Sequence, residues 1–369
     1  MSSLSVVAKK RNYGIDLLRI VSMLMVVILH VLGQGGILKT AEPLSVGYEI
    51  AWFLEILCYC AVNCYALVSG FVGVEARFKY SNVAVIWLQV LCYSVGIAFV
   101  AALISPKIYL GAVLEGATPI INNLYWYFTA YFCIFLFVPV FNKLINALNV
   151  KQLKLLGITI FAVFCILQLV TRISAGREPF YTNRGYSALW LGLLYILGGI
   201  LKKTGWLQQL KGYVLGLLYL GVCLITWAER LVVDYINSTG MREETLKSYL
   251  TEYISPTILL SAVFLVVAFS KLETGKILNK IIAFFAPLTF GVYLIHVQKH
   301  VWEYLLKGRF AEYAELHPAL LPLAVLGTAV AIFLVCALID FARDRLFKLL
   351  KIKNLLVRLE TKFLGDIWS

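Results

Sequence analysis

An arginine and a histidine lie eleven positions apart in the first apolar segment, which reads GIDLLRIVSMLMVVILHV. Eleven steps of about 100° on an α-helix bring Arg19 and His30 to nearly the same face, about 16 Å apart along the axis. Asp16 precedes Arg19 by three residues and can pair with it. The spacing therefore indicates a polar seam, a row of polar side chains along one helix face from Asp16 and Arg19 to His30. His30 is the candidate general base of this seam, because imidazole is the usual general base near neutral pH. A snorkelling arginine and a histidine bonded to a neighbouring helix would give the same pattern, so both interpretations stay open at this point.

A second candidate base lies in a late apolar segment, IIAFFAPLTFGVYLIHVQKHVWEY. Tyr293 and His296 are three residues apart there and share a helix face. Counted from the middle of their own segments, His30 and His296 lie roughly 8 Å and 9 Å towards the outer side, so we expect two histidines at similar depth. His296 and His300 have a metal-ligand spacing. With no cysteine nearby and only Glu303 as a further ligand, we expect no metal site.

Two other groups of residues could contact a substrate. The segment SGFVGVEARFKYSN carries Arg77 and Lys79. Two basic residues at a helix end could hold phosphates, although ordinary anchoring of positive loops explains them equally well. The aromatic run LYWYFTAYFCIFLFVP places Trp126 and Tyr127 where a helix would enter the membrane from the outer side, as an interfacial belt would.

Three further polar residues, Glu55, Asn63 and Gln89, lie inside apolar segments. Polar groups in such segments mark either a functional cavity or a contact between helices. We expect each of the three to form a hydrogen bond between helices rather than to act in catalysis, although they could line the same cavity as the seam.

The elements that must position these residues are transmembrane helices. Of the 369 residues, 61% belong to the set AVILMFWYC and only 14% are charged, against about 25% in an ordinary soluble domain. This composition excludes a pair of soluble domains and a disordered chain. Apolar segments of about twenty residues match ~30 Å of hydrocarbon, so the expected fold class is all-α, a polytopic membrane bundle of about ten helices. The expected spans are roughly 15–34, 48–72, 81–105, 122–142, 153–171, 186–201, 212–229, 251–270, 281–300 and 319–340.

Charge orients this bundle. The net charge is +13, which we attribute to basic loops and not to binding of nucleic acid. With the N-terminus in the cytoplasm, 21 of the 33 lysines and arginines fall in inside segments and 11 in outside loops. An even number of spans returns the C-terminus to the cytoplasm. We expect residues 346–369 to form a basic amphipathic tail on the inner surface of the bilayer.

The same residues resemble a known family. The spacing of Arg19 and His30 within RNYGIDLLRIVSMLMVVILH resembles the first helix of the membrane acyltransferase-3 family. Later segments resemble its second, fourth and late helices: CAVNCYALVSGFVGVEARFKY, LYWYFTAYFCIFLFVPVFNKL and FGVYLIHVQKH. The resemblance covers about residues 11–345. It implies a multi-pass enzyme of the bacterial cytoplasmic membrane that moves an acyl group, usually acetyl, from cytoplasmic acetyl-CoA to a hydroxyl of an envelope glycan, with no bound cofactor.

The resemblance also implies roles. The arginine and histidine of the family's first helix correspond to Arg19 and His30, and its late histidine to His296. We expect His30 to act as the base with help from His296, or to carry the acetyl group briefly, and Arg19 to stabilise developing charge or hold the CoA end of the donor. The chain either acylates its acceptor directly or passes the group to a separate extracytoplasmic transferase. The substrate-binding candidates are Arg77, Lys79, Asp16, Tyr293, Trp126 and Tyr127.

An alternative function belongs to another class. Ten helices with charged residues inside the membrane also fit a secondary transporter, or an exporter of a lipid-linked glycan, without acyltransferase activity. No inverted half-repeat is visible in the sequence, which argues against a transporter.

The predicted orientation can be tested by labelling. A cysteine introduced at Thr239 should react with a membrane-impermeant thiol reagent added outside, and one introduced at Leu148 should not, because the charge asymmetry places these positions on opposite sides. Equal labelling of both positions would contradict the ten-span arrangement.

Overall fold

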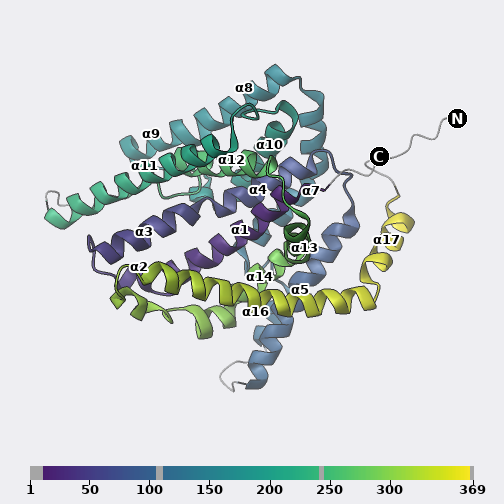
Figure 1. Ribbon diagram of the computed structural model, residues 1–369. Helices are drawn as coiled ribbons and strands as arrows, with labels where there is room; N and C mark the ends of the chain where they lie inside the picture. The colour runs from purple at the N-terminus through teal and green to yellow at the C-terminus, as the bar shows by residue number, and fades with distance from the viewer. Residues whose placement is uncertain (1–10, 105–110, 241–244, 366–369) are drawn as a thin grey trace.

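The computed structural model describes residues 11–104, 111–240 and 245–365, and across these ranges it contains helices and no strand (Figure 1). The all-helical membrane fold is therefore confirmed. The principal helices are α1 (Tyr13–Leu29), α2 (Ile37–Thr40), α3 (Val46–Tyr59), α4 (Ala61–Gly73), α5 (Tyr80–Ile104), α6 (Gly111–Ala117), α7 (Trp126–Ala147), α8 (Val150–Phe161), α9 (Gln168–Ala175), α10 (Ala188–Thr204), α11 (Gly212–Thr239), α12 (Pro256–Ser270), α13 (Lys276–Phe285), α14 (Thr289–His296), α15 (Lys299–Val301), α16 (Leu321–Leu349) and α17 (Ile352–Phe363).

Each of the ten expected spans overlaps one helix or a run of consecutive helices, and these differ in length. Within the described ranges, eight helical runs are long and apolar enough to cross a membrane: Tyr13–Thr40, Val46–Gly73, Tyr80–Ile104, Trp126–Ala147, Val150–Ala175, Gly212–Thr239, Lys276–His296 and Leu321–Leu349. The other two, α10 and α12, have 17 and 15 residues. The count of ten and the side on which each terminus lies stay predictions.

Helix α1 lies inside the bundle, where α3, α4, α12, α13, α14 and α16 all pack against it (Figure 1). In its most apolar 18-residue window 61% is buried, whereas the corresponding figure for α11 is 11%. The start of α1 is locked to the end of α12. The Asn12 side chain accepts from Ile15 N and donates to the Ser270 carbonyl at 2.9 Å, and a Cβ at Gly14 would lie 2.0 Å from the Phe269 carbonyl oxygen. These contacts fix the register of the helix that carries Arg19 and His30.

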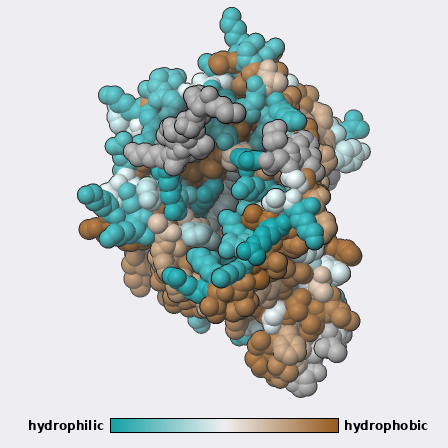
Figure 2. Space-filling view, turned by 90° about the vertical axis from the view of Figure 1, so that its right-hand side faces the viewer, coloured by the Kyte–Doolittle hydropathy of each residue, from teal (hydrophilic) through white to brown (hydrophobic). Residues whose placement is uncertain are grey.

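The outer helices present apolar side chains to the surroundings. On α11, for example, Leu217, Ile225 and Val232 are exposed, as lipid contact requires. The end of the bundle at which α1 begins is different: Figure 2 shows hydrophilic side chains gathered around a hollow on that face, with hydrophobic flanks beside it. The surface therefore has the apolar sides and polar end of a membrane-embedded bundle.

Two polar contacts between helices agree with expectation and position the later helices. The Asn63 amide donates to the Tyr253 carbonyl at 2.7 Å and accepts from Trp190 Nε1 at 3.2 Å. Gln89 donates to Asp340, a fully buried carboxylate on α16. Among the described residues no side chain of another helix is hydrogen-bonded to Glu55, so the expectation of a helix–helix hydrogen bond was wrong for that residue.

Asp340 also fixes α14, which carries His296. It pairs with Arg343 at 2.7 Å and accepts from the Tyr93 hydroxyl at 2.7 Å, so α5 and α16 are tied together around one carboxylate. A Cβ at Gly291 would lie 2.0 Å from the Asp340 carboxyl carbon. Only glycine lets the backbone of α14 approach this buried pair so closely.

The last helix, α17, docks on the start of α5. Glu360 accepts hydrogen bonds from the backbone N–H groups of Tyr80 and Ser81 at 2.6 Å and 3.2 Å, and so caps α5 from a distant part of the chain. Burial raises the pKa of the Glu360 carboxyl, but hydrogen bonds from Ser81 and Tyr80 outweigh this and hold the pKa below its usual value. This contact is therefore fully present above the ordinary pKa of a glutamate and is lost as the pH falls through the lowered value. Helix α16 runs to Leu349, four residues past the boundary predicted at 345, and α17 forms the amphipathic part of the tail.

The close packing of α4 on α10 yields a prediction about stability. A Cβ at Gly198 would lie 2.0 Å from the Leu67 carbonyl oxygen, so Gly198→Ala should force the two helices apart and lower stability by about 1–3 kcal/mol. Thermal unfolding of the purified protein in detergent measures the change. Gly216→Ala on α11 is the matched control, because a Cβ there meets nothing within 4 Å. Equal Tm values for the two variants would contradict the packing argument.

Candidate active site

His30 lies where the α-helix α1 passes into a π-helical turn. The α-helix ends at Leu29, and residues His30–Gln34 form a π-helical turn (η1) in which Gly35 N donates to the His30 carbonyl at 2.8 Å. The turn ends at two glycines: Gly36 has φ +100°, and a Cβ at Gly35 would lie 2.1 Å from the Val31 carbonyl oxygen. Such turns occur often at functional sites, because the extra residue re-aims the side chains beside it.

The two predicted histidines meet. His30 Nδ1 lies 2.9 Å from His296 Nε2, although the residues are 266 positions apart. His296 is the last residue of α14 and is 1% exposed, whereas His30 is partly exposed to a cavity. The edge of the Trp302 ring system packs against His30, with ring centroids 4.8 Å apart. The pair is thus held on one side by a helix end and on the other by an indole.

The hydrogen bonds assign the protons on these rings. His296 Nδ1 lies 2.6 Å from the Val292 carbonyl oxygen, and only an N–H can donate to a carbonyl. In a neutral His296 the proton is therefore on Nδ1, and Nε2 has a lone pair that accepts from His30 Nδ1–H. This leaves the lone pair of His30 on Nε2. The sequence indicated two histidines at similar depth, and their contact defines which nitrogen of His30 can act as base or nucleophile.

His30 faces a cavity of about 260 Å³ with a mostly aromatic wall. Predicted site residues Trp126, Tyr127 and Tyr293 line it, as do five more aromatic side chains: Tyr59, Tyr65, Tyr186, Tyr253 and Phe290. The sequence predicted an interfacial belt for Trp126 and Tyr127, whereas the structure has both side chains in the wall of this cavity. We call it the histidine cavity.

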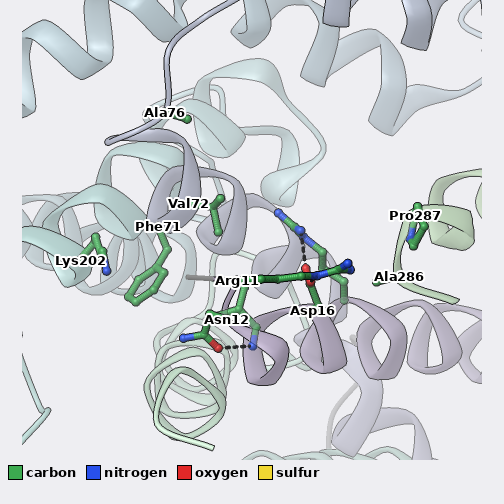
Figure 3. Close-up of a pocket in the computed structure, with 11 residues that line it drawn as sticks. Arg11, Asn12, Asp16, Phe71, Val72, Ala76, Lys202, Ala286 and Pro287 are labelled. Atoms are coloured by element: carbon green, nitrogen blue, oxygen red, sulfur yellow. Dashed lines mark hydrogen bonds and ion pairs between the residues drawn. The ribbon is translucent and has the colours of Figure 1, made fainter. Parts of the chain in front are cut away.

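A second cavity, of about 520 Å³, lies at the start of α1 and is lined by Arg11, Asn12, Asp16, Arg19 and Lys202 among others (Figure 3). We call it the arginine cavity. The predicted pair of Asp16 and Arg19 is present at 2.8 Å, and the other oxygen of Asp16 accepts from Arg11 at 2.5 Å. Figure 3 shows Asp16 beside Arg11 in the middle of the cavity, with Lys202 on one side and Pro287 on the other. Asp16 pairs with both arginines, and Lys202 lies 3.9 Å from Glu75. Three cations and two carboxylates leave an excess of positive charge, which suits a polyanionic ligand.

One tyrosine lies between the two cavities. Tyr65 lines the histidine cavity, and its hydroxyl donates to the Arg19 backbone carbonyl at 2.8 Å. Arg19 and His30 are eleven residues apart on α1, about 16 Å along the axis. The two cavities are therefore stacked along one helix, with Tyr65 between them.

Two predicted phosphate ligands are not brought into this arrangement. Arg77 and Lys79 are exposed in the segment between α4 and α5, and they line neither cavity. Ala76, which precedes Arg77, does line the arginine cavity. The structure brings Arg11 and Lys202 there instead. The sequence could have indicated Arg11, because it lies only two residues before the start of α1. Nothing in the local sequence marks Lys202, which comes from α10.

The metal-ligand spacing of His296 and His300 does not form one helix face. Helix α14 ends at His296, and His300 belongs to the separate helix α15, where its ring stacks on Tyr304 at 6.5 Å. Among the residues that the structure describes, no group of three or more His, Cys, Asp or Glu side chains is arranged to hold a metal ion.

An oriented imidazole in the wall of an aromatic cavity, with a cationic cavity farther along the same helix, gives this membrane bundle the parts of a group-transfer enzyme. The family model described as Acyltransferase domain (Acyl_transf_3) matches residues 12–341, nearly the whole chain. The chain belongs to this membrane acyltransferase-3 family, and the protein is a membrane acyltransferase. No curated protein and no solved structure matches the chain.

The proton assignment predicts unequal effects at the three histidines. A general base contributes about 10²–10⁴-fold, so His30→Gln should lower acyl transfer by at least 10²-fold, since glutamine keeps a hydrogen bond but cannot take the proton. His296→Gln should cost less, because it removes only the partner that orients His30. His300→Gln, on the neighbouring helix and outside the histidine cavity, should keep the wild-type rate.

Release of free CoA thiol from acyl-CoA measures these rates in purified protein. A His30→Gln enzyme that retains more than a tenth of the wild-type rate would overturn the assignment of His30 as base.

Proposed function

We propose that the protein is an O-acetyltransferase of the bacterial cytoplasmic membrane. It moves an acetyl group from cytoplasmic acetyl-CoA to a hydroxyl of a cell-surface polysaccharide or other envelope glycan. The observation that supports this most strongly is the bonded histidine pair, which leaves His30 Nε2 free at the wall of a cavity. A hydroxyl is a poor nucleophile, so its attack on a thioester needs a base of this kind.

In the proposed reaction, the acceptor oxygen attacks the thioester carbonyl while its proton passes to His30 Nε2. The positive charge on His30 is shared with His296 through the Nδ1–H hydrogen bond, because His296 Nε2 can accept the second proton. The tetrahedral intermediate collapses and breaks the carbon–sulfur bond. The CoA thiolate leaves with the proton from His30, so the products are an acetyl ester and free CoA. A brief acetyl-histidine intermediate on Nε2 would use the same geometry.

The arginine cavity suits the phosphates of the donor. Arg11, Arg19 and Lys202 supply positive charge, and Asp16 holds both arginines in place. From there the extended pantetheine arm of acetyl-CoA would pass Tyr65 to bring its thioester to His30. Arg77 and Lys79, which follow the lining residue Ala76 in the chain, would add attraction at longer range.

The acceptor would enter the histidine cavity from the other side of the bilayer. Direct acylation of the glycan and transfer through a separate extracytoplasmic protein both fit this arrangement. Membership of an acyltransferase family favours an enzyme over the alternative of a secondary transporter or glycan exporter. We propose no nucleic-acid partner. The apolar side chains exposed on the outer helices support contact of the chain with the lipid bilayer.

The donor site predicts a difference between two neighbouring lysines. Charge-assisted contacts to phosphate contribute about 1.5–3 kcal/mol each, so Lys202→Ala should raise the KM for acetyl-CoA about tenfold or more. Lys203→Ala is the matched control, since Lys203 is exposed on the same helix and does not line the cavity. Initial rates of CoA release against acetyl-CoA concentration give both values. The same KM shift in both variants would indicate a general charge effect and contradict a site at Lys202.

A further inference from the structure

One acidic side chain in the histidine cavity has no partner. Glu55, on α3, lines the cavity and is 8% exposed. Its Oε2 atom is buried without a hydrogen bond, and among the described residues no lysine, arginine or histidine forms an ion pair with it. A buried carboxyl is costly unless its oxygens are hydrogen-bonded. Glu55 therefore has unused capacity to accept hydrogen bonds inside a cavity that also contains His30.

The carboxyl faces the turn that carries His30. Gly33, three residues after His30, also lines the cavity, and a Cβ built there would meet only Glu55 Oε1, at 4.0 Å. Glycine at this position thus keeps a side chain of the turn away from the Glu55 carboxyl. A ligand in the cavity has access both to this carboxyl and to His30, because both line it.

Four aromatic rings form a continuous wall in the same cavity. Tyr253 lies 5.2 Å from Tyr59 and 4.8 Å from Tyr186, and Trp126 lies 4.6 Å from Tyr186 by ring centroids. Trp126 and Tyr253 are nearly parallel, at 19°. Flat aromatic surface beside a hydrogen-bond acceptor matches a sugar ring, which has an apolar C–H face and hydroxyl donors at its edge.

The charge of the cavity restricts the sugar further. Within the described part of the chain, no lysine or arginine lines the histidine cavity, and Glu55 is its one carboxyl group. An anionic sugar would bury its charge here with no lysine or arginine among the described lining residues to compensate it, which is strongly unfavourable. A hydroxyl can hydrogen-bond to the Glu55 carboxyl without adding charge.

We propose that Glu55 is a specificity-determining residue for the acceptor: it accepts a hydrogen bond from the hydroxyl next to the one that is acylated. The sugar unit in the histidine cavity is then uncharged and has two neighbouring free hydroxyls, one directed to His30 Nε2 and one to Glu55. This rests on the proposed function, because it takes the acceptor to be the ligand of this cavity. The ammonium group of an amino sugar would also satisfy a carboxylate, and the experiment separates the two.

Binding is measured first, independently of turnover, on the purified full-length protein in detergent. The probes are methyl pyranosides of glucose, galactose and mannose, the 2-deoxy and 3-deoxy analogues of whichever binds best, and the corresponding glucuronide and glucosaminide. Quenching of tryptophan fluorescence reports binding, since Trp126 is part of the wall. We expect a neutral glycoside to bind best, one deoxy analogue to bind at least tenfold more weakly, and Glu55→Gln to bind the parent glycoside at least tenfold more weakly.

The decisive comparison combines the variant with the analogue. If Glu55 contacts the missing hydroxyl, the deoxy analogue should lose no further affinity in Glu55→Gln. Glu49→Gln is the matched control, because Glu49 lies on the same helix outside the cavity and accepts from Trp227 at 3.0 Å. Gly33→Leu, which keeps the carboxyl but fills the space before it, should also weaken binding.

Several results would overturn the proposal. These are failure of every neutral glycoside to bind, tighter binding of the glucuronide or the glucosaminide, unchanged affinity in Glu55→Gln, and equal losses in Glu55→Gln and Glu49→Gln. Acetyl-CoA hydrolysis without acceptor is measured in parallel and should be the same in wild type and in the control variant Glu49→Gln, because Glu49 lies outside the histidine cavity. Glycoside binding in a protein that never cleaves acetyl-CoA would refute the proposed function while leaving the role of Glu55 in binding intact.

Discussion

The chemistry of His30 depends on one short chain of hydrogen bonds that begins in the backbone of α14. The Val292 carbonyl fixes the proton of His296, and His296 in turn fixes the proton of His30. Water would compete for each of these bonds at a surface, but inside the bundle His296 is almost fully buried, so the order of protons is set by the protein alone. The same bond gives the charge a second ring to occupy when His30 takes a proton.

That chain of hydrogen bonds works only if α1 and α14 are held in register. Helix α1 is fixed at its start by Asn12 and by the close approach of Gly14 to the end of α12. Helix α14 is fixed by Gly291, which lies against the buried Asp340. Both devices use a glycine where backbone meets a neighbouring helix, and in a membrane such close contact replaces the hydrophobic force that would hold helices together in water.

The two cavities along α1 differ in the charge and polarity of the residues that line them. In the arginine cavity, Arg11 and Arg19 share Asp16 and Lys202 lies near Glu75, so the cations outnumber the carboxylates. Among the described residues that line the histidine cavity there is one carboxyl group and no lysine or arginine, and the remaining wall is largely aromatic. A buried carboxyl oxygen without a hydrogen bond lowers stability, so Glu55 marks a place where the fold gives up stability for a ligand. The cationic cavity suits a polyanionic donor, and the aromatic cavity suits a neutral, hydroxyl-rich acceptor.

The sequence by itself determined the helical membrane class, the approximate positions of the apolar helices and the contact of Asp16 with Arg19 within one helix. It also indicated the two histidines at similar depth. It did not identify Lys202 as part of the arginine cavity, and it assigned Glu55 to a helix contact that does not exist. It said nothing of the proton on each imidazole. The physical reason is that helical periodicity fixes which residues share a face of one helix, whereas the partner across the gap comes from packing between segments such as α1 and α14, 266 residues apart at the histidine pair, and only tertiary structure decides that.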